Sequence, residues 1–269
     1  MIIGASLGSF KGLTLEQSMQ LYLTLMNSFD IKAVELRFEK EEARPSMWPW
    51  EENEGLADFL SNFEVTGAHL PFAYLNPISP NPGIKEESLN QLKTALDKAS
   101  QLNMNYAVMH TRGSAYGLTH AQLLNEWEKV LEELADYAKS RSILLTIENC
   151  DFLGNLKELA GVIRKINSEW LRITLDIGHA HIRRIRQAND SIPYTLAGLA
   201  LKALDMTFAP FIFKKYMPYE EYDSIKDFLY SENDLIYNIH VHDYNGRRDH
   251  LALDSGKIGF SLMILLKES

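Results

Sequence analysis

The chain has 269 residues, of which 46% are hydrophobic, so it can bury a large core as one α/β barrel of roughly 250 residues or as two smaller domains. Its formal net charge of -9 offers no broad attraction for a polyanion, which disfavours nucleic acid as a partner. Cys150 is the single cysteine, so an intrachain disulfide and a thiolate-rich metal site are both excluded.

The N-terminal segment has the features of neither a signal peptide nor a membrane anchor. The sequence MIIGASLGSFKG lacks a basic region followed by an apolar stretch. No window elsewhere approaches the roughly 20 apolar residues that cross a bilayer. We therefore expect a soluble, cytoplasmic protein with no membrane partner.

Short apolar runs rich in β-branched residues alternate along the chain with longer segments of helical period. This alternation is typical of repeated βα units around a parallel sheet. In chain order, the seven predicted strands are IIGAS near the start, AVELRF from Ala33, EVTGAH from Glu64, YAVMH from Tyr106, ILLTIE from Ile143, LRITLD from Leu171 and IYNIHVH from Ile236.

The segments between these strands read as helices. Thr14 with Gln17, and Thr119 with Gln122, are predicted capping boxes at two helix starts. No low-complexity linker divides the chain, so we predict a single domain over residues 1–269. Its predicted fold is an α/β (β/α)8 TIM barrel.

Two segments depart from a regular barrel. The stretch from about 181 to 235 is longer than one crossover needs, which predicts an insertion between strands six and seven that serves as a lid or an oligomer contact. The sequence KIGFSLMILLKES reads as the helix after strand seven, so the eighth strand and last helix are missing from the sequence. We expect that another segment covers the gap or that the chain is a truncated form, since open strand edges are an aggregation liability.

Seven of the eight histidines, all except His120, lie at or just beyond the C-terminal end of a predicted strand. In a TIM barrel these ends meet at the face where active sites form. His240 and His242 are two residues apart on one strand, so their side chains should point the same way. Imidazole and carboxylate ligands suit a divalent metal ion, zinc or manganese first, with cobalt, iron or magnesium as alternatives. The candidate residues at these strand ends are His69, His110, Glu148, Asp176, His179, His240 and His242.

Glu148 and Asp176 each follow an apolar run, where an unpaired carboxylate would be costly. Metal binding would offset that cost, and pairing with Arg172 or Arg112 is the alternative. A lone histidine at a strand end is more often a hydrogen-bonded structural residue than a ligand, so the metal hypothesis depends on the joint placement of the group.

Three further residues are candidates for contact with a substrate. Trp48, in the segment RPSMWPWEEN, could form an apolar wall, although a tryptophan beside prolines more often packs on the scaffold. Arg112 and Arg248 lie in the segments that follow the fourth and seventh predicted strands. Both could bind polar groups of a substrate at the same face.

Five motifs in order resemble the xylose isomerase-like TIM-barrel superfamily, which includes sugar isomerases and epimerases and the apurinic endonuclease IV-like proteins of AP endonuclease family 2. The resemblance spans nearly the whole chain. No single motif is specific, but their order and spacing together are. The motifs are GAHLPF with Asn76 following, AVMHTRG, LTIENC, LDIGHAH and NIHVHDYNGRRDHL.

The resemblance implies metal ligands. Glu148, Asp176 and His240 would be the shared ligands, and His179 completes an Asp-x-x-His pair. The positions that supply further ligands in the endonuclease branch are His69, His110, Asp249 and His250. Two departures stand out: the Asp249–His250 pair is adjacent rather than separated by one residue, and the glutamate that the family takes from strand eight is absent.

These residues lead to a first hypothesis, a metal-dependent isomerase or epimerase of a sugar or sugar-like hydroxy-carbonyl substrate that reacts through an enediolate. Glu148 would be the base, and His242 or Asp243 the second acid or base.

Two alternatives stay open. One is an endonuclease IV-like metal-dependent phosphodiesterase acting on abasic DNA, which the full histidine set favours. The other is a catalytically inactive barrel acting as a binding subunit, which the missing strand permits, since fold alone does not fix function. A homo-oligomer is compatible with each hypothesis.

Overall fold

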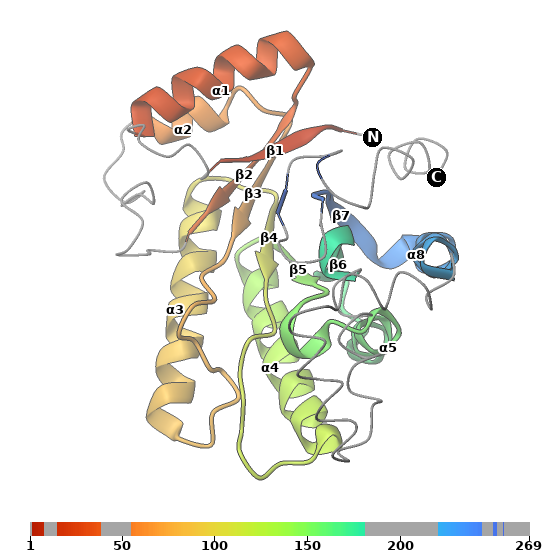
Figure 1. Ribbon diagram of the computed structural model, residues 1–269. Helices are drawn as coiled ribbons and strands as arrows, with labels where there is room; N and C mark the ends of the chain where they lie inside the picture. The colour runs from red at the N-terminus through yellow and green to blue at the C-terminus, as the bar shows by residue number, and fades with distance from the viewer. Residues whose placement is uncertain are drawn as a thin grey trace, which may run out of the picture.

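The computed structural model describes residues 2–7, 15–38, 55–180, 220–243, 250–251 and 255, and these form a curved, wholly parallel sheet. The strands hydrogen-bond in chain order from first to last (Figure 1). They are β1 (Gly4–Leu7), β2 (Ala33–Arg37), β3 (Val65–His69), β4 (Tyr106–Met109), β5 (Leu144–Glu148), β6 (Leu171–Asp176) and β7 (Ile236–His240).

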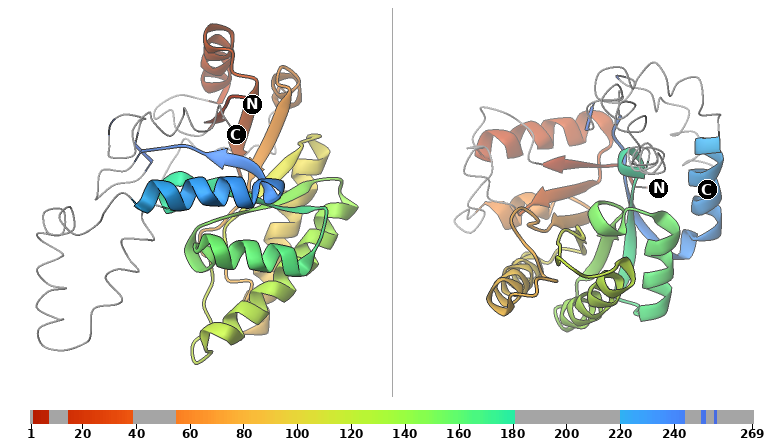
Figure 2. Two further views of the ribbon diagram at one scale, coloured as in Figure 1. Left: turned by 90° about the vertical axis from the view of Figure 1, so that its right-hand side faces the viewer. Right: turned by 60° about the horizontal axis from the view of Figure 1, so that its bottom comes forward.

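Helices follow most strands and lie on the outer side of the sheet, as the right-hand view of Figure 2 shows. They are α1 (Leu15–Phe29), α2 (Leu56–Leu60), α3 (Pro82–Gln101), α4 (His120–Ser140), α5 (Leu156–Ile166) and α8 (Glu220–Ser231), with short 3-10 turns η2 (Asp151–Leu153) and η4 (Asn233–Leu235). Among the helices that the structure describes, none is long and apolar enough to cross a membrane.

The predicted TIM-barrel fold is confirmed as a half-barrel with seven of the eight strands. Each predicted strand contains the observed one or overlaps it, and the shifts are small: β1 begins at Gly4 and β7 already ends at His240. The capping box of Thr119 with Gln122 is confirmed at the start of α4. Thr14 lies outside the described residues. In the described ranges β1 and β7 form the two edges, and no eighth strand joins them.

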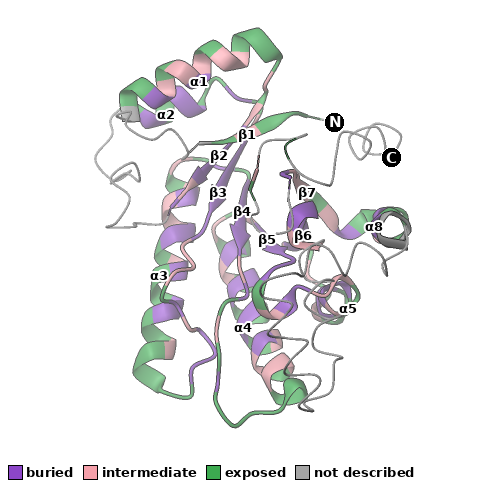
Figure 3. Cartoon of the chain, in the orientation of Figure 1, coloured by how far each residue is buried: buried purple, intermediate pink, exposed green. Residues whose placement is uncertain are grey.

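The core lies between the outer face of the sheet and the helices. In α4 the buried residues recur at helical spacing and include Trp127, Leu131 and Leu134. They face apolar outward residues such as Leu145 and Ile147 of β5 in one hydrophobic cluster. Figure 3 shows this buried layer along the strands and the inner sides of α3 and α4. Full burial of such an aliphatic side chain contributes about 1.5–3 kcal/mol.

Strand alternation decides which residues turn to the inside of the half-barrel. Successive side chains point to opposite faces, so the residues between the outward apolar ones face inward. The register pairs Asp176 with His240 and Glu148 with Thr174, which places these side chains on one face. The polar strand ends therefore meet at one inner mouth of the sheet.

Residues 220–235 of the predicted insertion form α8 and η4. α8 buries Ile225, Phe228 and Leu229 in the core, as a crossover helix does. Residues 181–219 lie outside the described residues, so the predicted lid or oligomer contact stays a prediction for that segment.

Candidate metal centre

Glu148 is only 1% exposed and lies at the centre of a ring of histidines. His110 Nε2 lies 3.3 Å and His69 Nε2 3.6 Å from Glu148 Oε2. His240 Nδ1 lies 3.2 Å from the same oxygen, and His179 Nδ1 lies 2.7 Å from Oε1. We call His69, His110 and Glu148 the Glu148 group.

The donor atoms of the Glu148 group fit a divalent cation. Ligand atoms about 2.1 Å from a tetrahedral ion lie about 3.4 Å apart, close to the observed spacings. Glu148 Oε2 and His110 Nε2 are buried, and neither has a hydrogen-bond partner in the part of the chain that the structure describes. Buried polar atoms are normally satisfied, so these two atoms indicate a site that a cation would complete.

The far nitrogens of the two histidines are held in a way that supports this fit. His69 Nδ1 lies 3.2 Å from the carbonyl oxygen of Leu70, and His110 Nδ1 lies 3.4 Å from Asp151 Oδ2. An oxygen at Nδ1 favours a proton on that nitrogen and leaves the Nε2 lone pair to bind metal. Phe72 stacks on the His110 ring, with 4.3 Å between centroids, which further fixes its plane.

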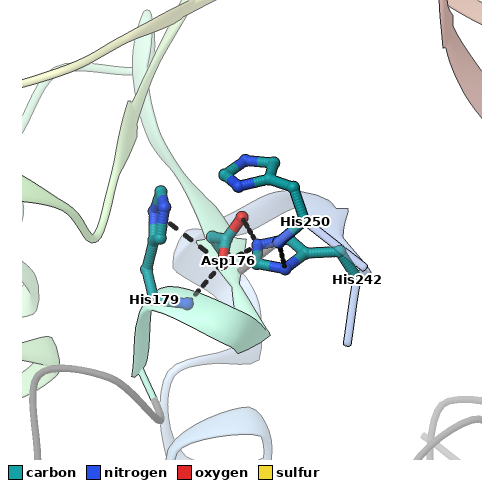
Figure 4. A group of neighbouring side chains, drawn as sticks. All are labelled: Asp176, His179, His242 and His250. Atoms are coloured by element: carbon teal, nitrogen blue, oxygen red, sulfur yellow. Dashed lines mark hydrogen bonds and ion pairs between the residues drawn. The ribbon is translucent and has the colours of Figure 1, made fainter. Parts of the chain in front are cut away.

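A second group, the Asp176 group, consists of Asp176, His179, His242 and His250 (Figure 4). His242 Nε2 lies 3.0 Å from both Asp176 oxygens, and the His179 backbone N–H donates to Asp176 Oδ1 at 2.6 Å. The His250 backbone N–H donates to His242 Nδ1 at 2.9 Å, so this nitrogen is an acceptor. The four side chains each offer a ligand atom, and these atoms lie within 4.8 Å of one another.

Glycine makes room for the second group. A Cβ on Gly178 would lie 2.0 Å from His242 Cε1, so only glycine lets this ring lie against the chain after β6. Asn149 then fixes the backbone of Asp176, because its side chain donates to the Asp176 carbonyl and accepts from the Asp176 N–H.

Burial and charge act in opposite directions on the titrating groups. Burial alone would raise the pKa of Glu148, but the positive charge of His110 and the close approach of the His179 and His240 rings hold it well below 4.5. Burial alone would lower the pKa of His240, but the Glu35 and Glu148 carboxylates raise it well above 6.5. In the metal-free chain, protonated histidines therefore balance the buried carboxylates.

The structure brings most of the predicted ligands together. Of the residues described, Glu148, Asp176 and His240 form one group with donor atoms within 4.8 Å. The arginine alternative is not seen: Arg172 donates to the carbonyl oxygens of Ser168 and Leu171, and Arg112 lies over the Phe72 ring.

The remaining predicted residues have mixed placements. Asp243 is fully buried, and its backbone forms an isolated antiparallel bridge with Leu251 beyond the end of β7. Trp48, Arg248 and Asp249 lie outside the described residues.

Sequence reasoning missed three polar residues that touch these groups, namely Glu35, Asn149 and Asp151. Glu35 accepts from His240 Nε2 at 3.0 Å from the inner face of β2. A signal was available, because strands buried on both faces are usually apolar and a glutamate in AVELR breaks that rule.

A cavity of about 660 Å³ lies beside Phe72, the residue that stacks on His110. Its lining includes Phe72, Asn76, Arg112 and Gly113 from the segments after β3 and β4. The Arg112 guanidinium lies 5.6 Å from the centre of the Phe72 ring, which also contacts the rings of His110 and His69. The Phe72 ring therefore lies between the Arg112 guanidinium in the cavity and His110 of the candidate metal centre.

A family model described as xylose isomerase-like TIM barrel matches residues 23–268. Two uncharacterized proteins of Methanocaldococcus jannaschii also match: MJ1311 is 28% identical over 134 residues and MJ1614 is 26% identical over 200 residues. The matches cover 47% and 72% of this chain, and 46% and 62% of the relatives. The chain therefore spans less than two thirds of the length of either relative.

Solved structures share the fold over the whole chain. A D-tagatose 3-epimerase-like protein matches with a TM-score of 0.68 and 22% identity, covering 100% of this chain and 86% of that one. A putative xylose isomerase from Rhodospirillum rubrum gives 0.67 and 16%, covering 100% and 86%. A D-allulose 3-epimerase from Methylomonas sp., solved in complex with D-allulose, gives 0.65 and 14%, covering 100% and 80%. At these identities the likeness shows the fold.

Proposed function

The chain belongs to the xylose isomerase-like TIM-barrel family, and from that membership we propose that it is a metal-dependent isomerase or epimerase of a sugar or sugar-like hydroxy-carbonyl compound. The observation that carries the proposal is the buried Glu148 carboxylate within 3.6 Å of four histidine nitrogens. Structural neighbours that include a D-allulose 3-epimerase add support from the fold.

Glu148, Asp176 and His240 would hold the ion, together with His69, His110 and His179. When bound, a divalent ion supplies Lewis acidity toward a carbonyl oxygen. The proposed native metal is zinc or manganese, since both accept mixed imidazole and carboxylate ligands.

We assign proton removal to Glu148. In the metal-free chain the protonated rings keep its pKa low and make it a weak base. With an ion bound and the rings neutral, the charge of the ion would still oppose the effect of burial, so proton removal is assigned to a Glu148 oxygen that the ion does not hold. His242 is the proposed second acid or base, since it lies at the mouth beside His179 and His250. Asp243 is a weaker candidate because it is fully buried.

The cavity beside Phe72 is the proposed substrate site. Arg112 is exposed there and could bind a hydroxyl or anionic group at the substrate end remote from the metal. This position suits ketoses and their phosphates, which carry such a group several carbons from the carbonyl.

Deuterium exchange tests the proposal directly. Metal-loaded protein is incubated with ketohexoses and their phosphates in heavy water, and exchange at the carbon next to the carbonyl is followed by NMR. We expect exchange that needs metal, disappears in Glu148→Gln and survives in Glu158→Gln, whose carboxylate pairs with His120 on the outer surface. If the metal-loaded protein exchanges no proton in any of these sugars, the proposal is contradicted and the binding-subunit hypothesis gains.

One observation favours a second candidate, a phosphodiesterase acting on abasic DNA. The ligand atoms form overlapping groups that share Glu148 and Asp176, an arrangement that could hold more than one ion. The net charge of -9 argues against a DNA partner. Nicking of a duplex with one abasic position, with an intact duplex as control, would support this candidate over the first.

A further inference from the structure

Glu35 is a buried carboxylate on the inner face of β2, outside the group of metal ligands. Three donors converge on its Oε2 atom: His240 Nε2 at 3.0 Å, the Tyr106 hydroxyl at 3.0 Å and Asn238 Nδ2 at 3.3 Å. The side chain is 8% exposed. A buried charge is tolerated only when it is paired and hydrogen-bonded, and these contacts meet that condition.

The sheet register builds this arrangement. Glu35 pairs with Gly67 on β3, and Gly67 pairs with Tyr106 on β4, so the three residues form one row across the sheet. A Cβ on Gly67 would lie 2.3 Å from the Tyr106 ring. Because Gly67 has no side chain, the ring lies across β3 and its hydroxyl reaches Glu35 on β2.

His240 connects this row to the candidate metal centre. Its Nε2 atom faces Glu35, while its Nδ1 atom lies 3.2 Å from Glu148 Oε2 and 3.9 Å from Asp176 Oδ2. A carboxylate that accepts a hydrogen bond from one ring nitrogen fixes the plane of the ring and raises the basicity of the other nitrogen. The ring can therefore offer Nδ1, and not Nε2, to an ion.

We propose that Glu35 is a positioning residue that holds the Nε2–H of His240 and so presents Nδ1 toward Glu148 and Asp176 as a metal ligand. Tyr106 and Asn238 hold the Glu35 carboxylate in turn. The inference rests on the metal centre of the proposed function, and it holds whichever substrate that centre acts on.

A merely structural role makes a different prediction. If the Glu35–His240 pair only stabilises the half-barrel, its removal lowers the free energy of unfolding and leaves metal affinity unchanged. If Glu35 positions His240, metal affinity falls even where the protein stays folded. The two roles are separated by measuring both quantities on the same variants.

The test compares Glu35→Gln with Glu158→Gln. Both variants neutralise a glutamate that pairs with a histidine, but the Glu158–His120 pair is partly exposed and includes no proposed metal ligand. Zinc affinity is measured by competition with a coloured chelator, without any substrate. The Nε2 proton of His240 is followed by NMR in metal-free and zinc-loaded protein and is assigned by its loss in His240→Gln.

For Glu35→Gln we expect zinc affinity to fall by about 10- to 100-fold and the hydrogen-bonded Nε2–H resonance to shift or vanish, with Glu158→Gln unchanged. Unchanged affinity and an unchanged resonance in folded Glu35→Gln overturn the proposal. If Glu35→Gln does not fold, Glu35→Asp decides. It keeps the charge but shortens its reach, so affinity should fall at least about fivefold, and wild-type affinity overturns the proposal. The resonance is present without metal or turnover, so a protein with no epimerase activity still tests Glu35.

Discussion

The two donor groups at the mouth of the sheet are built from the same residue types but satisfy their polar atoms differently. In the Asp176 group, the backbone N–H groups of His179 and His250 donate to the Asp176 carboxylate and to His242 Nδ1. In the Glu148 group, Glu148 Oε2 and His110 Nε2 face each other at 3.3 Å with no hydrogen-bond partner in the described ranges. Similar composition therefore does not imply a similar role.

This difference indicates that the two groups contribute differently to metal binding. A carboxylate that already accepts several hydrogen bonds, as Asp176 does, loses little when no ion is present, whereas a buried oxygen without a hydrogen bond gains most from one. We expect the Glu148 group to dominate metal affinity and the Asp176 group to position Asp176 and His179. Four changes test that comparison.

The largest effect is expected from Glu148→Gln. The amide removes the carboxylate charge that faces His110, His179 and His240, so metal affinity should fall by at least about 100-fold, or roughly 3 kcal/mol. The free energy of unfolding of the metal-free protein should fall by about 3–5 kcal/mol, since one partner of buried ion pairs is lost. Chelator competition and urea denaturation measure the two quantities. Wild-type metal affinity in this variant would remove Glu148 from the centre.

Substitution of one histidine in each group compares their contributions to metal affinity. His110→Gln should weaken metal binding by about 10- to 100-fold, while His250→Ala, which keeps the backbone N–H, should change it by less than about threefold. Elemental analysis after dialysis gives the stoichiometry. Loss of one metal equivalent in His250→Ala would show that the Asp176 group holds its own ion, as the phosphodiesterase hypothesis requires.

The pH dependence should have opposite signs with and without metal. The pKa values of His110 and His240 are raised above 6.5, so their contribution to metal-free stability is complete below that pH and is lost as the pH rises through the raised values. The Glu148 pKa is lowered, so its contribution is lost as the pH falls well below 4.5. Metal affinity should rise with pH, by up to about tenfold per unit for each proton displaced. Thermal unfolding across pH, with zinc and with chelator, checks both signs; equal slopes would contradict the assignment.

The smallest effect is expected from Gly178→Ala, which touches the Asp176 group alone. The added Cβ would displace the His242 ring, at a cost of about 1–3 kcal/mol in the free energy of unfolding. Metal affinity should stay within about threefold of wild type, because Asn149 still fixes the backbone of Asp176 and the Glu148 group is untouched. Gly161→Ala is the control, since a Cβ there meets no atom within 4 Å. A collapse of metal affinity would mean that the two groups act as one.

Much of this arrangement could be predicted from the sequence. The strands were found because apolar runs such as LLTIE and LRITLD end in a carboxylate, and the strand-end rule then brought Glu148 and Asp176 together. Glu35 could not be found in that way because it lies in the middle of β2, and its partners come from β4 and β7. Such contacts depend on strand tilt and on the space left by Gly67, which the sequence pattern does not encode.

Asn76 couples the two segments that line the cavity. Its side chain donates to the Ser114 carbonyl oxygen and accepts from the Ser114 N–H, so it joins the segment after β3 to the segment after β4. Neither segment can move away from the other without breaking both of these hydrogen bonds. The two walls of the cavity should therefore move together as one unit and not independently.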